Sequence, residues 1–142
     1  MHAATVFQDK ICIYGGVKQP FGAPWEDMWS SADGKNWNRD TKKASSNSSN
    51  PLGCALQVIG KKLHLFGTFR DVNETRSRYL VWDEGQETWE PSEISTEHSW
   101  DQQEGQTFSL SSVEYGGIAF VRALGYRGSD RPGDLVLFVP RS

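Results

Sequence analysis

The residue types best suited to ligand binding lie in three polar segments, residues 15–27, 67–78 and 122–134. Arg and Lys side chains bind anionic groups, and aromatic rings stack on sugars or peptide side chains. If these segments are loops on one face of the fold, they suit an acidic peptide or a glycan. The alternative is that they are ordinary solvated loops. The candidate ligand-binding residues are Lys18, Trp25, Arg70, Arg76, Arg127 and Arg131.

The sequence contains no pattern that combines a nucleophile with a base, and no metal-ligand or phosphate-binding motif. His2, His64 and His98 are far apart, and His64 lies in an apolar stretch typical of a packed strand. Cys12 and Cys54 do not form a C-x-x-C pair and are interpreted as reduced, packed thiols. We therefore predict no catalytic residue, no cofactor and no bound metal, and an enzyme is the less favoured interpretation.

Length and charge limit the other possibilities. The chain has 142 residues and a net charge of −3, which favours one domain and argues against nucleic acid or anionic lipid as partners. No apolar run reaches the length of a membrane span. The first residues lack a basic region followed by an apolar stretch, so a cytoplasmic location is expected. The alternative is export of a chain whose signal has been removed.

An internal repeat indicates the fold. When the sequence is aligned with itself at an offset of 52 positions, Ala3–Gly16 matches Ala55–Thr68 without a gap. The matched pairs include Ala3 with Ala55, Val6 with Val58, Ile11 with Leu63, Ile13 with Leu65 and Tyr14 with Phe66. Each copy consists of an apolar strand, a short polar turn and a second apolar strand that ends in glycine. This is the pattern of a β-hairpin.

Two further strands complete each copy. The third strand carries Trp29 or Trp82, and the fourth opens with Trp37 or Trp89. The copies cover approximately residues 2–51, 53–105 and 106–142, and the last is weaker and has no fourth strand. No segment has a sustained helical period. The sequence therefore predicts an all-β chain with two complete four-stranded antiparallel sheets and an incomplete third sheet.

The four tryptophans of the repeat are predicted to lie in the core, because large rings at matched positions can fill the space between stacked sheets. The alternative is an exposed platform on which a sugar stacks. Gly15 and Gly67 end the second strands, where the chain is expected to turn sharply beside neighbouring strands.

These features resemble the kelch repeat of β-propellers. The resemblance rests on "ICIYGG" (Ile11–Gly16), "DMW" (Asp27–Trp29) and the closing tryptophan, and it covers residues 2–89 best. The stretch "SSADGKNW" (Ser30–Trp37) is also similar to the hairpins of bacterial kelch-like and Asp-box propellers. Thr68 departs from the pattern by replacing the second glycine of the pair. The resemblance implies a propeller fold and specifies function only weakly.

Closure of a propeller requires about four to eight blades. Three blades leave two open faces, so we expect a homodimer that completes a six-bladed ring, or further blades in a longer polypeptide. The predicted function is a non-catalytic binding or scaffolding module that binds a peptide or glycan through loops on one face. The alternative is a fragment of a carbohydrate-active propeller enzyme, galactose-oxidase-like or sialidase-like.

Overall fold

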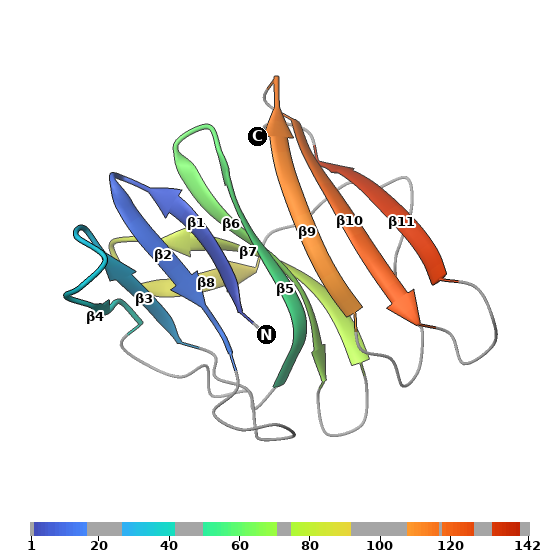
Figure 1. Cartoon of the computed structure of the whole chain (residues 1–142), viewed down its shortest axis with the longest axis horizontal. Coiled ribbons are helices and arrows are strands. Elements are labelled where there is room, and N and C mark those ends of the chain that lie inside the picture. Colours follow the sequence, from blue (N-terminus) through green and yellow to red (C-terminus); the bar gives the residue numbers. More distant parts are fainter. Residues whose placement is uncertain are drawn as a thin grey trace.

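The structure is a computed structural model of the whole chain. It describes the backbone of residues 2–16, 27–41, 50–70, 75–91, 108–116, 118–126 and 132–139. Side chains are described for residues 2–16, 27–41, 54–67, 80–90, 112–116 and 118–120. Within these ranges the chain forms β-strands and turns without helices, in three antiparallel sheets that stand side by side (Figure 1). The predicted all-β class, with two four-stranded sheets and a smaller third one, is confirmed.

The first two sheets are four-stranded meanders in which neighbouring strands are consecutive in sequence. The first sheet contains β1 (Ala3–Phe7), β2 (Lys10–Tyr14), β3 (Met28–Ser31) and β4 (Asn38–Arg39). The second contains β5 (Asn50–Ile59), β6 (Lys62–Arg70), β7 (Thr75–Asp83) and β8 (Thr88–Pro91). The third contains β9 (Phe108–Tyr115), β10 (Ile118–Tyr126) and β11 (Pro132–Val139). The repeat in the sequence thus corresponds to a repeat of sheets.

Polar side chains fix the turn between β3 and β4. Asp33 Oδ1 accepts hydrogen bonds from the backbone N–H groups of Lys35 and Asn36, both over 2.8 Å, and from Ser31 Oγ over 3.0 Å. Asn36 Nδ2 donates to Asp33 Oδ2 over 2.7 Å, and Gly34 N donates to Ser31 Oγ over 2.9 Å. These bonds hold the pKa of Asp33 well below its usual range, because they stabilise the charged carboxylate. The sequence motif therefore forms a tight, acid-capped hairpin.

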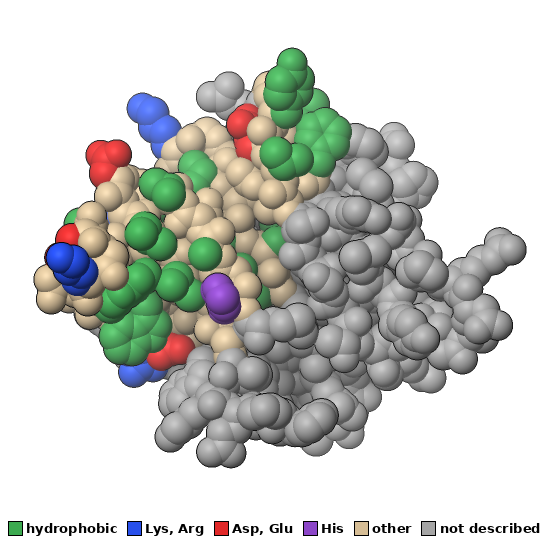
Figure 2. Space-filling view, viewed as in Figure 1, with side chains coloured by type: hydrophobic (Ala, Val, Ile, Leu, Met, Phe, Trp, Pro, Cys, Tyr) green, Lys and Arg blue, Asp and Glu red, His purple; other side chains and the backbone are tan. Residues whose placement is uncertain are grey.

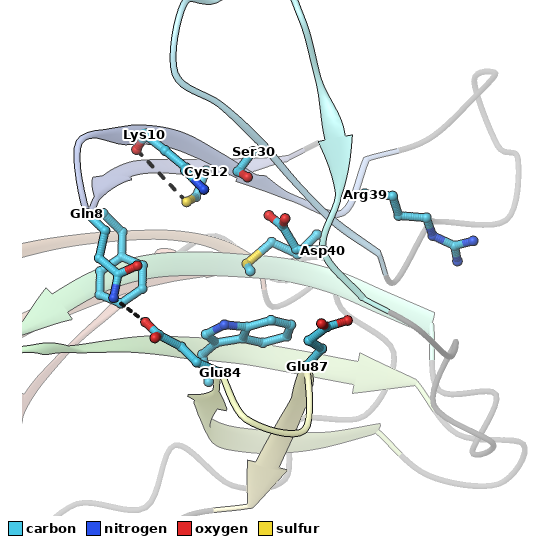
Figure 3. A pocket seen from close by; sticks show the side chains of 11 residues that line it. Gln8, Lys10, Cys12, Ser30, Arg39, Asp40, Glu84 and Glu87 are labelled. Atoms are coloured by element: carbon cyan, nitrogen blue, oxygen red, sulfur yellow. Dashed lines mark hydrogen bonds between the residues drawn. The ribbon is translucent and has the colours of Figure 1, made fainter.

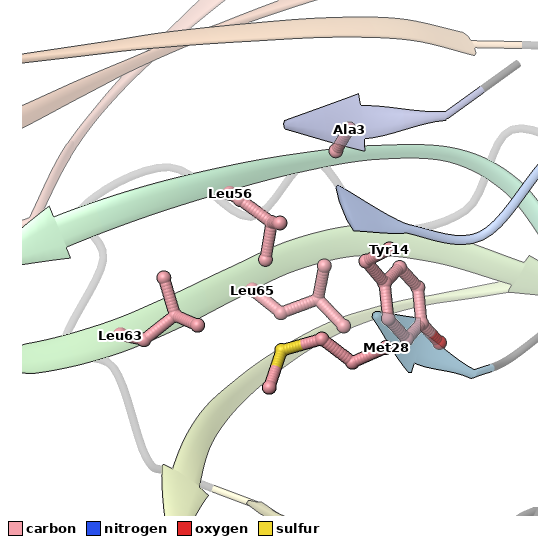
Figure 4. Close-up of a cluster of buried hydrophobic side chains, with 6 residues drawn as sticks. All are labelled: Ala3, Tyr14, Met28, Leu56, Leu63 and Leu65. Carbon is pink, nitrogen blue, oxygen red and sulfur yellow. The ribbon is translucent and has the colours of Figure 1, made fainter. Parts of the chain in front are cut away.

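The main hydrophobic core lies between the first and second sheets (Figure 4). The first sheet contributes Ala3, Tyr14 and Met28, and the second contributes Leu56, Leu63 and Leu65. Half-buried side chains surround this cluster, namely Phe7, Cys54, Val58, Leu80, Trp82 and Trp89. Trp89 makes edge-to-face contacts with the rings of Tyr14 and Trp82, at centroid distances of 5.7 Å and 5.2 Å. The core is therefore formed by the facing sides of two copies of the repeat.

The opposite side of the second sheet packs against the third sheet. Strand β5 lies between β1 and β9 and contacts both of them. Ser112 Oγ, on β9, donates to the carbonyl of Leu56 over 3.3 Å and lies 3.1 Å from Gln57 Oε1. Ala119 on β10 is completely buried. The first strands of the three sheets thus lie next to one another, with β5 between β1 and β9 (Figure 1).

Two of the four repeat tryptophans depart from the predicted core position. Trp82 and Trp89 pack against the main core, as predicted. Trp29 is 39% exposed, and Trp37 is half-buried and does not belong to the core cluster. The reason for Trp29 is that its side chain points to the face of the first sheet that no described sheet covers.

The predicted loop over residues 67–78 is mostly strand. β6 continues to Arg70 and β7 begins at Thr75, so that Gly67 lies inside β6 and pairs with both Cys54 and Arg78. Similarly, much of the predicted loop over residues 122–134 belongs to β10 and β11. The prediction for Gly15 is confirmed, because its φ of 76° lies in the left-handed region. Long cross-strand pairing explains the differences, since β5, β6 and β7 extend well beyond the repeated hairpin.

Candidate functional site

A pocket of about 230 Å³ opens at the edge of the interface between the first and second sheets (Figure 3). Its apolar wall contains the Trp82 indole with Phe7 and Met28. Polar and charged side chains form the remainder of the lining, namely Gln8, Lys10, Cys12, Ser30, Arg39, Asp40, Glu84 and Glu87. The pocket therefore combines an aromatic surface with several hydrogen-bonding groups.

Turns from both sheets position the polar side chains. The turn between β1 and β2 contains Gln8 and Asp9, both at positive φ, and it directs Gln8 toward the second sheet. Gln8 Nε2 donates a hydrogen bond to Glu84, in the turn between β7 and β8. Asp40 follows β4, where its backbone N–H donates to the carbonyl of Met28 over 2.8 Å. Figure 3 shows Asp40 on the side of the first sheet, and Glu84 and Glu87 on the side of the second.

Among the described residues that line the pocket, acidic side chains outnumber cationic ones. Asp40, Glu84 and Glu87 carry carboxylates, whereas the cationic side chains in the lining are Lys10 and Arg39. Arg39 Nε forms an ion pair with Asp27 Oδ2 over 3.3 Å, which neutralises one of these cations. The resulting negative field disfavours an anionic ligand and suits a neutral or cationic one.

Cys12 is a buried thiol in the lining of this pocket. Burial raises its pKa above the ordinary value, and the nearby Asp40 carboxylate acts in the same direction. Its Sγ lies 4.0 Å from the carbonyl oxygen of Lys10. Both effects favour the protonated thiol, which is a weaker nucleophile than the thiolate.

The arrangement is suited to binding by stacking and hydrogen bonding. Carboxylates and the Gln8 amide can accept hydrogen bonds from hydroxyl groups, while the indole can contact the apolar face of a sugar ring. Among the residues with described side chains, no three His, Cys, Asp or Glu groups are close enough together to hold a metal ion. Nor do the described residues include a helix that is long and apolar enough to cross a membrane.

Two of the sequence-predicted binding residues can be placed at the level of the backbone. Arg70 ends β6 and pairs with Thr75, and Arg76 pairs with Phe69, so both lie at the same end of the β6–β7 hairpin. The side chains of Arg70 and Arg76, and the whole of Lys18, Trp25, Arg127 and Arg131, lie outside the described residues. The predicted cluster therefore stays a prediction.

The pocket lining reaches both ends of β2. Gln8 and Lys10 lie at the start of this strand, whereas Met28 pairs with Tyr14 at its other end and directly follows the predicted loop over residues 15–27. The second strands β2, β6 and β10 run in the same direction in Figure 1, so the segments that follow them begin on one side of the molecule. The β1–β2 turn, which contributes Gln8 to the pocket lining, is on the other side. In the sequence, the only signal that relates to the pocket is the similar hairpin spacing around Trp29 and Trp82.

No protein-family model matches this chain, and no curated protein matches it either.

Proposed function

We propose that this protein is a non-catalytic, kelch-like β-propeller module that binds a glycan in the pocket between its first and second sheets. The observation that carries the proposal is that Trp82 lines an open pocket together with Asp40, Glu84 and Glu87. Sugars present an apolar ring face and a rim of hydroxyl groups, and this lining offers a partner for each. A neutral sugar also avoids the repulsion that the carboxylates would exert on an anion.

A peptide is the other ligand that the fold would accommodate. The negative pocket favours a basic side chain there, whereas the Arg-rich segments predicted from the sequence favour an acidic peptide. The glycan is preferred because it uses both the aromatic and the polar lining.

A carbohydrate-active enzyme is the second candidate, and the three carboxylates in one pocket favour it. Glycoside hydrolysis requires two carboxyl groups, one of which acts as an acid with a raised pKa. Incubation with oligosaccharides followed by measurement of released reducing ends separates the two proposals. We expect binding without release, and release that is lost in Glu84→Gln or Asp40→Asn would establish the enzyme instead.

Binding is tested by two-dimensional NMR of the indole N–H groups during titration with neutral oligosaccharides. A panel based on glucose, galactose, mannose and N-acetylglucosamine covers the common ring stereochemistries. We expect the Trp82 signal, assigned through its loss in Trp82→Phe, to shift with at least one probe. Trp82→Leu should weaken binding by roughly fivefold, which corresponds to about 1 kcal/mol for a stacking contact.

Matched substitutions locate the site. Glu84→Gln and Asp40→Asn alter carboxylates inside the pocket, whereas Asp9→Asn makes the same chemical change on an exposed residue outside its lining. We expect weaker binding for the first two variants and no change for the third. Signal shifts that are equal in Asp9→Asn and Glu84→Gln, or that never involve Trp82, would contradict this site.

A further inference from the structure

The outer face of the first sheet is apolar and exposed. Val6 and Ile11 are cross-strand neighbours on it, and Ile13 and Trp29 form the next neighbouring pair. Residues two apart in a strand and residues directly opposite share a face, so these four side chains form one patch. Val6 is 66% exposed, Ile11 is 40% exposed and Trp29 is 39% exposed. Hydrophobic side chains over this sheet are visible in Figure 2.

The repeat shows what covers such a face. The residues equivalent to this patch in the second copy are Val58, Leu63, Leu65 and Trp82. There they face the first sheet, and Leu63 and Leu65 have no exposed surface. The covering side chains come from the opposite face of the first sheet, which carries Ala3, Phe7 and Tyr14. Each such face is thus buried by the opposite face of a neighbouring sheet.

The third sheet presents the complementary open face. Its side toward β5 carries Ser112 and the fully buried Ala119. Its other side carries Val113 and Tyr115, which are 60% and 79% exposed, together with Ile118 opposite Tyr115. Tyr115 precedes the β9–β10 turn as Phe7 precedes the β1–β2 turn, so this is the same face that covers the second sheet in the first copy.

We propose that a second copy of this chain covers both faces, with the third sheet of each copy packed on the first sheet of the other. The contact is head-to-tail and continues the stacking already present between consecutive sheets. It occurs twice in a pair, because each copy presents one face of each type. Two copies bring together six sheets, which is within the range that closes a propeller ring.

Two simpler arrangements account less well for the two exposed apolar faces. Packing of two first sheets against each other would bury the Val6 patch but leave the Tyr115 patch exposed. Solvent alone would leave two separate apolar patches at opposite ends of the stack, which soluble proteins seldom tolerate. The head-to-tail pair buries both patches and repeats a geometry seen inside the chain.

The mass of the 142-residue chain in solution is the first test. We expect light scattering coupled to gel filtration to give twice the chain mass of 16.0 kDa at micromolar concentration. Val6→Glu and Tyr115→Lys each place a charge in the proposed contact at an exposed position, so the sheets themselves should fold. Each variant should raise the dissociation constant by at least about tenfold. Gln86→Glu adds the same negative charge as Val6→Glu, but on an exposed turn, and should leave the mass unchanged.

Mixing the variants tests the pairing of faces. A mixture of Val6→Glu with Tyr115→Lys can form one unmodified contact and one contact with opposite charges, so it should recover the dimer. A mixture of Val6→Glu with Tyr115→Glu places two like charges together and should recover less. Circular dichroism of each variant confirms that its sheets are folded.

Three results would overturn the proposal. One is a monomer at micromolar concentration. Another is a dimer that Val6→Glu dissociates but Tyr115→Lys does not, which would indicate packing of two first sheets. The last is a series of masses that grows with concentration, because head-to-tail contacts that fail to close produce open chains.

Discussion

The indole N–H of Trp29 donates a hydrogen bond to Asp27 Oδ2 over 3.0 Å. The same oxygen accepts the ion pair from Arg39, which lies opposite Trp29 across the β3–β4 pair. Asp27 is itself buried, and its carbonyl accepts a hydrogen bond from Gly15 N over 3.2 Å. These contacts hold the Trp29 ring against the outside of the first sheet, away from the core.

Trp29 and Trp89 should therefore respond differently to truncation. Trp89→Ala removes a ring that packs on Tyr14 and Trp82, and we expect it to lower the free energy of unfolding by about 3 kcal/mol. Trp29→Ala should change the stability of the single chain by less than about 1 kcal/mol. Urea unfolding measures both, in the Val6→Glu background so that assembly does not contribute. Equal losses for the two variants would contradict the positions of these rings.

Trp89 also offers a milder substitution. Its Nε1–H is buried and has no hydrogen-bond partner among the residues that the structure describes. Trp89→Phe removes that donor while it keeps an aromatic ring, so part of the lost packing is offset by the removal of an unsatisfied polar group. We expect a loss of at most about 1 kcal/mol in the same experiment. A loss as large as that of Trp89→Ala would show that the indole nitrogen has a partner.

At the turn between β9 and β10, the energetic cost of backbone strain can be measured separately from side-chain packing. Gly116 has a φ of +61°, and a Cβ atom placed on it would meet nothing within 4 Å. Gly116→Ala should therefore lower the free energy of unfolding by about 1 kcal/mol through conformation alone. Gly116→Asn is the matched variant, because Asn tolerates the left-handed region, and it should be less destabilising. The idea is wrong if alanine is as well tolerated as asparagine.

The sequence predicted the hairpins well because their signals are local. β1 begins and ends as predicted, and the turn after it contains the polar residues Gln8 and Asp9. The repeat also shows that Val6 and Val58 are equivalent. It cannot show that one is exposed and the other packed, because this depends on whether a neighbouring sheet covers that face. The orientation of Trp29 was missed for the same physical reason.

The candidate pocket was harder to predict. Gln8 and Glu84 are 76 positions apart in the sequence and meet only because two sheets pack against each other. Their individual residue types are ordinary for exposed turns. The Arg-rich segments stood out by composition, yet composition alone does not determine where strands end, and β6 continues through Gly67 to Arg70.

His64 should give the stability a dependence on pH. It is buried on the side of the second sheet that faces the third, and burial lowers its pKa to about 4 from an ordinary value of 6.5. Between these values the unfolded chain binds a proton that the folded chain does not. Stability is therefore fully present above pH 6.5 and is lost as the pH falls toward 4, by up to about 3 kcal/mol. His64→Leu should flatten this part of the urea-unfolding profile, and an unchanged slope would contradict the assignment.

The turn at Asp33 should also make the free energy of unfolding depend on pH, in a lower pH range than His64 does. Its four hydrogen bonds favour the carboxylate, so the folded pKa lies below the ordinary value of 3.8. The stabilisation is fully present above pH 3.8 and decreases as the pH falls further, because the unfolded chain takes up the proton first. Asp33→Asn keeps the shape of the side chain but cannot lose a charge. The difference in stability between the native chain and this variant should therefore shrink as the pH falls from 5 to 3.

The effect will be modest because Asp33 is fully exposed. To separate it from His64, both chains should carry His64→Leu, and a difference that stays constant with pH would show that the turn does not depend on the charge.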